Sequence, residues 1–182
     1  MSRPTVGAAA EPGLDPDRFR EALQFVYRGL DAEVARLAPV CRLSGRCCRF
    51  EEYGHTLFVS APEFAVLLAD APPPSRPLDD GLTCPWQDAR GRCTAREARP
   101  LGCRVYFCDP DYEPHAPDLA EAAIARLKKV VDGLGLPWDY APLHRHLREA
   151  RDGGRFPTSG VDREPSRAPE GPAPEPRRAF MT

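Results

Sequence analysis

The feature that most constrains this chain is a group of seven cysteines confined to residues 41–108. They are Cys41, Cys47, Cys48, Cys84, Cys93, Cys103 and Cys108. A segment with so many thiols holds them as disulfides, as metal ligands or as catalytic nucleophiles. Each alternative imposes a different geometry, so the choice among them decides how the whole segment folds.

The rest of the chain argues against disulfides. Its first residues, MSRPTVGAAAEPG, lack the apolar stretch of a secretion signal, and no run approaches the roughly 18 apolar residues that cross a membrane. We therefore expect a cytoplasmic protein without a membrane partner, in a reducing compartment where disulfides are seldom stable. The odd cysteine count would also leave one thiol unpaired. A net charge of −2 gives no reason to expect nucleic acid as a partner.

A catalytic thiol is also hard to reconcile with the clustering, because a single nucleophile needs no other cysteines around it. The sequence has no phosphate-binding loop, Ser/His/Asp set or paired carboxylates, so it assigns no enzymatic activity. The histidines are expected at the surface or in hydrogen bonds. Only His55, which lies near the first cysteines, is a candidate ligand.

Amphipathic helices are predicted on both sides of the cysteines. Asp15 can cap a helix with Pro16 at its first position, and apolar residues then recur every three or four positions up to Leu37. A β-prone stretch follows at residues 55–60, and the capping box S-x-x-E then opens a helix over residues 61–69. This region is therefore expected to be helical with one short strand.

The second half of the chain contrasts an irregular stretch with two further helices. Residues 81–108 hold four cysteines and no sustained apolar period, so they should be irregular. Apolar spacing predicts helices over residues 118–134 and 142–150. The predicted fold class is mainly α: a small helical domain that scaffolds an irregular, cysteine-rich metal-binding loop region, with at most a short strand.

Composition sets the expected domain boundaries. Residues 1–14 and 151–182 are rich in proline and in small or charged residues, and we expect both to be disordered. The folded domain would then span residues 15–150, which is long enough to be stable without cross-links.

The cysteine spacing and its surroundings favour metal capture. The intervals C-x5-C-C, C-x8-C, C-x9-C and C-x4-C do not match paired zinc knuckles. Gly45 and Gly102 lie close to cysteines, where they permit tight turns. Residues 84–108 carry five arginines against two acidic residues, which would offset the negative charge of thiolates around a metal. Arg99 and Arg104 are the candidates for direct contact with the centre.

The adjacent Cys47 and Cys48 bear on the kind of metal. Side chains of neighbouring residues usually diverge, so both seldom reach one tetrahedral ion, whereas a cluster of several irons tolerates uneven spacing. We therefore predict an iron–sulfur cluster of the four-iron, four-sulfur kind, with zinc as the alternative cofactor. All seven cysteines are candidate ligands, and the firmest choices are Cys47 or Cys48 together with Cys93 and Cys103.

These stretches resemble a known family. CRLSGRCC at residues 41–48 and CPWQDARGRCTAREARPLGCRVYFC at residues 84–108 look like the bacterial CxxCxxCC proteins, often called the YkgJ-type cysteine cluster family. The resemblance extends to Val-Ser-x-x-Glu at residues 59–63 and R-P-x-x-C-R-x-[FY] at residues 99–106. The second cysteine of the family pattern is Ser44 here, and a hydroxyl is a poor ligand for a soft metal.

What the resemblance implies is a zinc- or iron-chelating domain. A similar cysteine arrangement occurs in a flagellin lysine methylase associated with an iron–sulfur cluster, but only the cysteine pattern is shared. We therefore predict a metal-cluster-binding protein with an electron-transfer or accessory redox role, acting with a redox or protein partner. The alternative is a structural zinc-binding module that mediates protein interactions.

Overall fold

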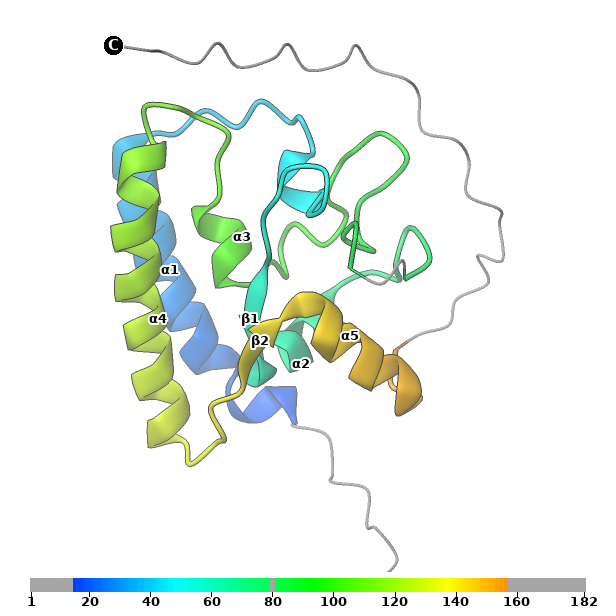
Figure 1. The fold of residues 1–182 in the computed structure, drawn as a ribbon. Helices are drawn as coiled ribbons and strands as arrows, with labels where there is room; N and C mark the ends of the chain where they lie inside the picture. The colour runs from blue at the N-terminus through cyan, green and yellow to red at the C-terminus, as the bar shows by residue number, and fades with distance from the viewer. Residues whose placement is uncertain (1–14, 79–80, 157–182) are drawn as a thin grey trace, which may run out of the picture.

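A computed structural model describes residues 15–78 and 81–156 of the chain. This part is mainly helical and contains one two-stranded sheet, which confirms the predicted fold class (Figure 1). Its elements are three short 3-10 helices, η1 (Pro16–Arg18), η2 (Arg46–Cys48) and η3 (Glu113–His115), the strands β1 (Phe58–Ser60) and β2 (Tyr140–Pro142), and the helices α1 (Arg20–Leu37), α2 (Ala61–Asp70), α3 (Leu101–Val105), α4 (Ala116–Gly133) and α5 (Leu143–Asp152). Disorder was expected of residues 1–14 and 151–182, and residues 1–14 and 157–182 lie outside the described residues.

Helices α1, α3 and α4 form what we call the helical layer. Helices α1 and α4 run antiparallel side by side, and α3 lies against both (Figure 1). Their apolar faces meet in one core, in which Leu30 and Leu127 are 0% exposed. The predicted apolar periods therefore produce the layer, although the last apolar position of α1, Leu37, remains 41% exposed.

A buried carboxylate joins this layer to α2. The Ser60 side chain accepts a hydrogen bond from the Glu63 amide at 3.4 Å, and Glu63 accepts one from the Ser60 amide at 3.1 Å, which confirms the predicted capping box. The other carboxylate oxygen of Glu63 accepts from the hydroxyl of Tyr27 in α1 at 2.9 Å and from the Leu101 amide in α3 at 2.8 Å. Glu63 thus fixes where α3 begins.

The remaining described residues contain a second core. Strands β1 and β2 pair antiparallel, with Val59 opposite Ala141, and α2 and α5 pack beside them. Side chains from these elements surround Trp86, and Phe156 meets the Trp86 ring edge-on at 6.2 Å between centroids. The packed chain therefore continues past residue 150, where the sequence placed the end of the domain.

The longest irregular segments, residues 41–57 and 81–100, lie beside this second core and are called the cysteine region. Figure 1 shows them as loops that cross one another at one end of the molecule. Helix α3 interrupts the stretch predicted to be irregular, and β2 was not predicted at all. No helix among the described residues has the length and apolar character to cross a membrane.

Candidate metal centre

Six of the seven cysteines line one cavity of about 250 Å³, here called the thiol cavity. A smaller hollow of about 20 Å³ adjoins it and is lined by five cysteines, including Cys84. Four cysteines line both spaces: Cys47, Cys48, Cys93 and Cys103. They come from three segments that are far apart in the sequence, so the fold gathers the residues chosen as the firmest candidate ligands.

Backbone contacts bring the first two segments together. Gly45 has a φ of 71°, and a Cβ at this position would lie 2.5 Å from the Gly91 carbonyl oxygen, so only glycine permits this approach. The buried side chain of Gln87 donates to the carbonyls of Gly45 at 2.9 Å and Gly91 at 3.4 Å. The Cys84 amide donates to the Cys48 carbonyl at 2.7 Å. The loop that carries Cys84 is therefore held directly against η2.

Cys93 and Cys103, which also line both spaces, are positioned by a β-bridge and by a helix. Cys93 pairs with Gln87 in an isolated antiparallel bridge, and the amide of the next residue, Thr94, donates to the Trp86 carbonyl at 2.8 Å. Cys103 lies on α3, two residues after Leu101, whose amide Glu63 holds. The helical layer thus supplies one thiol and the cysteine region supplies the others.

The adjacent thiols do not diverge as the sequence suggested. The sulfurs of Cys47 and Cys48 lie 3.9 Å apart, and both side chains face the same cavity because η2 turns the backbone tightly between them. The Cys48 thiol also lies within hydrogen-bonding reach of the thiols of Cys84 and Cys93. All seven cysteines are free thiols. In the described part of the chain, no three or more His, Cys, Asp or Glu side chains are placed to share a single metal ion.

Cys41 and Cys108 lie at the outer wall of the thiol cavity and do not line the smaller hollow. The amide of Val40 donates to the Asp109 carboxylate at 2.7 Å, which holds the two chain segments together. Ser44 also lines the cavity, and its hydroxyl lies 3.6 Å from the Cys108 sulfur. These outer thiols are therefore candidate ligands of lower rank than the four shared ones.

The thiols polarise one another. The hydrogen bond from Cys48, aided by Arg99 and Arg96 and opposed by burial, lowers the pKa of Cys47 to about 6. The Cys48 hydrogen bond and the Ala95 amide likewise lower the pKa of Cys93 to about 7.

The other two thiols of the group, those of Cys48 and Cys103, have raised pKa values. The pKa of Cys48 is raised because its proton is shared with its neighbours, and burial raises the pKa of Cys103. The site therefore combines two thiols that ionise readily with two that hold their protons, as expected where several thiols crowd together.

The two arginines proposed to contact the centre lie in different environments. Arg99 lines both the thiol cavity and the smaller hollow. Arg104 lines neither: it pairs with Asp31 at 2.7 Å, donates to the carbonyls of Glu97 and Arg99, and lies 4.3 Å from the centre of the Tyr27 ring. Helix α3 directs Arg104 toward α1, which its position beside Cys103 in the sequence did not reveal.

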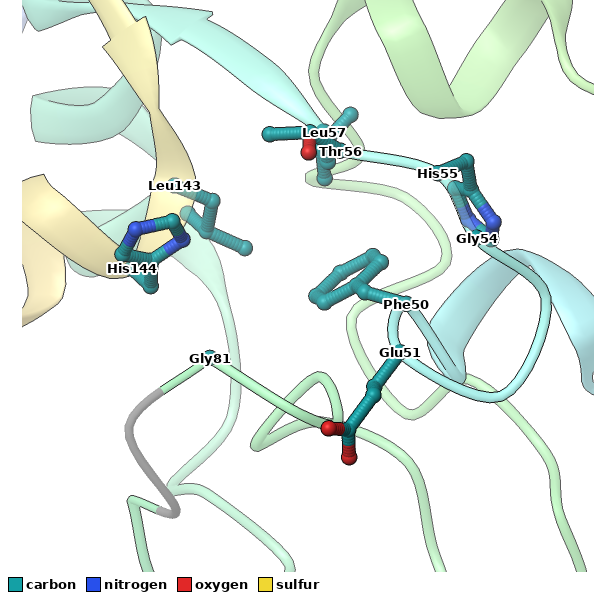
Figure 2. Close-up of a pocket in the computed structure, with 9 residues that line it drawn as sticks. All are labelled: Phe50, Glu51, Gly54, His55, Thr56, Leu57, Gly81, Leu143 and His144. Carbon is teal, nitrogen blue, oxygen red and sulfur yellow. The ribbon is translucent and has the colours of Figure 1, made fainter.

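His55 shares a cavity of about 180 Å³ with Cys47 and Cys103, whereas His144 and His146 line no described cavity that contains a cysteine. His55 stacks on Tyr106 with ring centroids 4.9 Å apart, and its Nε2 lies 3.4 Å from the Cys47 carbonyl oxygen. It also lines a separate cavity of about 340 Å³, where Figure 2 shows His55 and His144 on opposite sides. His146 is buried, with Nε2 3.0 Å from the Val59 carbonyl oxygen. His55 therefore contacts the backbone of a candidate ligand, Cys47.

Comparison of the chain with protein-family models, with curated proteins and with solved structures gives no match. The class that the fold and the cavity define is a small helical domain with a cysteine-lined cavity. Any assignment to the cysteine cluster family depends on the motifs alone.

Proposed function

We propose that this chain binds a metal centre through its cysteines, and that the centre is a four-iron, four-sulfur cluster. The observation that carries the proposal is the set of four cysteines, from three separated segments, that line both the thiol cavity and the smaller hollow. Thiolate is the ligand that iron–sulfur clusters use, and four thiolates complete such a centre. The proposed ligands are Cys47, Cys48, Cys93 and Cys103, with Cys84 as the neighbouring substitute.

The surroundings of the thiols support a negatively charged centre. Arg99 lies at the wall of both spaces and, with Arg96, favours the thiolate form of Cys47. The Ala95 amide donates toward the Cys93 sulfur, as backbone amides do in clusters whose potentials they adjust. When bound, an iron–sulfur cluster supplies one-electron oxidation and reduction. The proposed role is therefore electron transfer or support of a redox partner.

The distribution of the thiols supports a cluster over a single ion. They cover the wall of a cavity, and among the described residues no three of them are placed to hold a single metal ion. A cluster has several irons on its perimeter and can accept ligands from such a wall. The motif resemblance to the YkgJ-type family agrees with this proposal, and membership of that family is part of it.

Structural zinc is the second candidate, and one distance favours it. The Cys47 and Cys48 sulfurs are 3.9 Å apart, and a zinc ion with Zn–S bonds of about 2.3 Å separates its sulfurs by about 3.8 Å. The Cys48 thiol already contacts three other thiols, so a small movement of side chains could enclose one ion. In this case the domain would be a zinc-stabilised module that mediates protein interactions.

Anaerobic purification of the full chain, followed by metal and sulfide analysis and a visible spectrum, tests the proposal. An iron–sulfur cluster gives iron with acid-labile sulfide and a broad absorption that bleaches on reduction. Zinc gives a colourless sample with stoichiometric metal. A sample without metal, purified anaerobically with its thiols reduced, would rule out both candidates.

Single substitutions test the ligand set. Cys103→Ser and Cys93→Ser should abolish metal binding, because a hydroxyl is a poor ligand for soft metals. Cys41→Ser is the matched control, since Cys41 is exposed and lies only at the outer wall. Unchanged metal content in Cys103→Ser would contradict the proposed ligands, and so would complete loss in Cys41→Ser.

A further inference from the structure

Arginines from two segments line the thiol cavity next to its cysteines. They are Arg42, Arg92, Arg96 and Arg99. The described lining contains no Asp or Glu. We propose that the thiol cavity binds a small organic anion, one that carries a carboxylate or a phosphate group, through these four arginines.

The number of arginines exceeds what the proposed centre requires. Four thiolates around either a zinc ion or a cubane cluster with a 2+ core carry two negative charges. Four guanidinium groups therefore leave two positive charges without a match. Asp109 lies outside the lining and close enough to Arg42 for that arginine to help lower its pKa, after the stronger effect of the Val40 amide. Even with Asp109 counted, the cavity keeps a positive excess.

The ion pairs of the described residues show the same excess. Arg20, Arg104 and Arg126 each have a carboxylate partner within 4.0 Å. None of the four cavity arginines has such a partner in the described part of the chain. Guanidinium groups favour bidentate binding of carboxylate and phosphate. Unpaired arginines around a concave space therefore suit an oxyanion.

The arginine nearest the thiols is held in place. Its Nε donates to the Arg96 carbonyl at 3.0 Å, which fixes the Arg99 guanidinium at the wall that both hollows share. Among the described residues nothing accepts a hydrogen bond from its terminal nitrogens. A positioned donor of this kind lowers the entropy lost when an anion binds.

The same wall also has an apolar part, which is why we specify an organic anion. Leu43 is 49% exposed and has a φ of 53°, in the left-handed region that side chains with a Cβ seldom adopt. Tyr106 and Phe107 complete this part of the lining. The whole cavity measures about 250 Å³, below the roughly 300 Å³ where drug-sized pockets begin. Because the proposed centre would take the part of this space beside its four cysteines, the space left for an anion is small.

Calorimetric titration of the full, anaerobically purified chain tests this site with benzoate, phenyl phosphate, inorganic phosphate and the neutral benzamide. Benzoate and phenyl phosphate should bind, and benzamide should not. Inorganic phosphate that competes with phenyl phosphate identifies the phosphate group as the recognised part, whereas binding of benzoate alone identifies a carboxylate. Benzamide binding as tightly as benzoate would overturn the proposal, and so would no binding of either organic anion at millimolar concentration.

Arginine variants locate the site. Arg92→Gln and Arg96→Gln should each weaken anion binding about tenfold, as expected for loss of one charged hydrogen bond. Arg90→Gln is the matched control in the same loop, because Arg90 does not line the cavity, and it should change affinity less than twofold. An equal effect of Arg90→Gln would show that positive charge near the cavity attracts the probe without a specific site, and it would contradict the proposed anion site.

Metal analysis of the same samples separates this inference from the proposed function. Arg92→Gln should keep the metal content of the parent chain while it loses anion affinity. Anion binding by a metal-free chain would support this site and count against the metal centre. A metal-containing chain that binds no anion would support the metal centre and contradict the anion site. Loss of metal together with anion affinity in Arg92→Gln would also overturn the inference.

Discussion

The helical layer and the cysteine region bury their chain segments by different means. In the layer, α1, α3 and α4 pack leucine and valine side chains whose positions follow the helical repeat. In the cysteine region, Phe50, Trp86 and Ala95 belong to the second core. Elsewhere in this region backbone bridges and the side chain of Gln87 join the loops, and thiols fill the space between them. Apolar burial stabilises a segment without help. Crowded thiols stabilise a segment fully only when a metal binds them, because metal binding then contributes folding free energy.

Removal of the proposed metal should have the largest effect, and it should affect the two regions differently. Chelation should increase amide exchange in the cysteine region, at Cys84, Gln87 and Thr94, by about a hundredfold or more, because binding a structural metal is itself folding free energy. Exchange in the middle of α1 and α4 should change little. Hydrogen exchange with mass spectrometry measures both regions in one sample. A uniform increase over the whole chain would mean that the two regions do not differ in this way.

A cavity in the helical layer should have the converse effect. Leu127→Ala removes a side chain that is 0% exposed, and we expect a loss of about 2–5 kcal/mol in the free energy of unfolding. Metal content per folded molecule should stay unchanged, since the core around Leu127 includes residues of α3 but none of the loops at residues 41–57 and 81–100. Urea unfolding monitored by circular dichroism gives the first quantity.

Leu134→Ala controls for truncation of a leucine outside the core, because Leu134 follows α4 and is 37% exposed. Its cost should stay below about 1 kcal/mol. A Leu127→Ala variant that unfolds like Leu134→Ala would contradict the assignment of the layer as a self-sufficient core.

Glu63 tests the connection between the two regions. Its carboxylate accepts from Tyr27 in α1 and from the Leu101 amide at the start of α3, the helix that carries Cys103. Glu63→Gln keeps the shape but weakens these charged hydrogen bonds, which should cost about 2 kcal/mol of stability. Metal affinity should also fall, because α3 is then less firmly placed. Urea unfolding and competition with a chelator measure the two effects.

Glu52→Gln is the matched control for Glu63→Gln, since Glu52 is exposed and pairs only with Arg49 among the described residues. It should change stability by less than about 0.5 kcal/mol. If Glu63→Gln lowered stability and left metal affinity as it was, the position of α3 would not depend on this carboxylate.

The sequence predicted the elements whose causes are local. The apolar repeats of α1 and α4 and the Ser60–Glu63 capping box are fixed by residues a few positions apart, and all three were found. Helix α3 has only five residues and no repeat, and its start depends on a bond from Glu63, 38 positions earlier. Strand β2 contains a proline and exists because β1 lies beside it.

In the candidate site too, the sequence predicted some features, while others depend on tertiary packing. The residue type alone was enough to choose the candidate ligands, because few other residues in this chain could bind a soft metal. The direction of each arginine depends on tertiary packing, so Arg99 reaches the cavity while Arg104 turns to Asp31. The adjacent Cys47 and Cys48 face one cavity because η2 turns the backbone between them. Gly45, with its positive φ, lets the chain enter η2 close to Gly91. A glycine directly before the Arg46–Cys48 turn was the available signal.

The smallest expected effect concerns Tyr27, which the layer buries against the Glu63 carboxylate. Burial, and then the charge of Glu63, raise the pKa of the Tyr27 hydroxyl well above its usual value near 10. Tyr27→Phe loses a 2.9 Å hydrogen bond and should cost about 1 kcal/mol at pH 8.

The difference between the parent chain and Tyr27→Phe should then shrink with pH. Above pH 10 the unfolded tyrosine releases its proton while the folded one keeps it, so the stability that Tyr27 contributes is present below pH 10 and falls as the pH rises toward the folded pKa. Urea unfolding at several pH values measures this difference, and Tyr53→Phe, at a ring that is 36% exposed, controls for loss of a surface hydroxyl. A difference that stays constant from pH 8 to above pH 10 would show that Tyr27 ionises equally in both states, and the layer would then be less tightly closed around Glu63 than its contacts indicate.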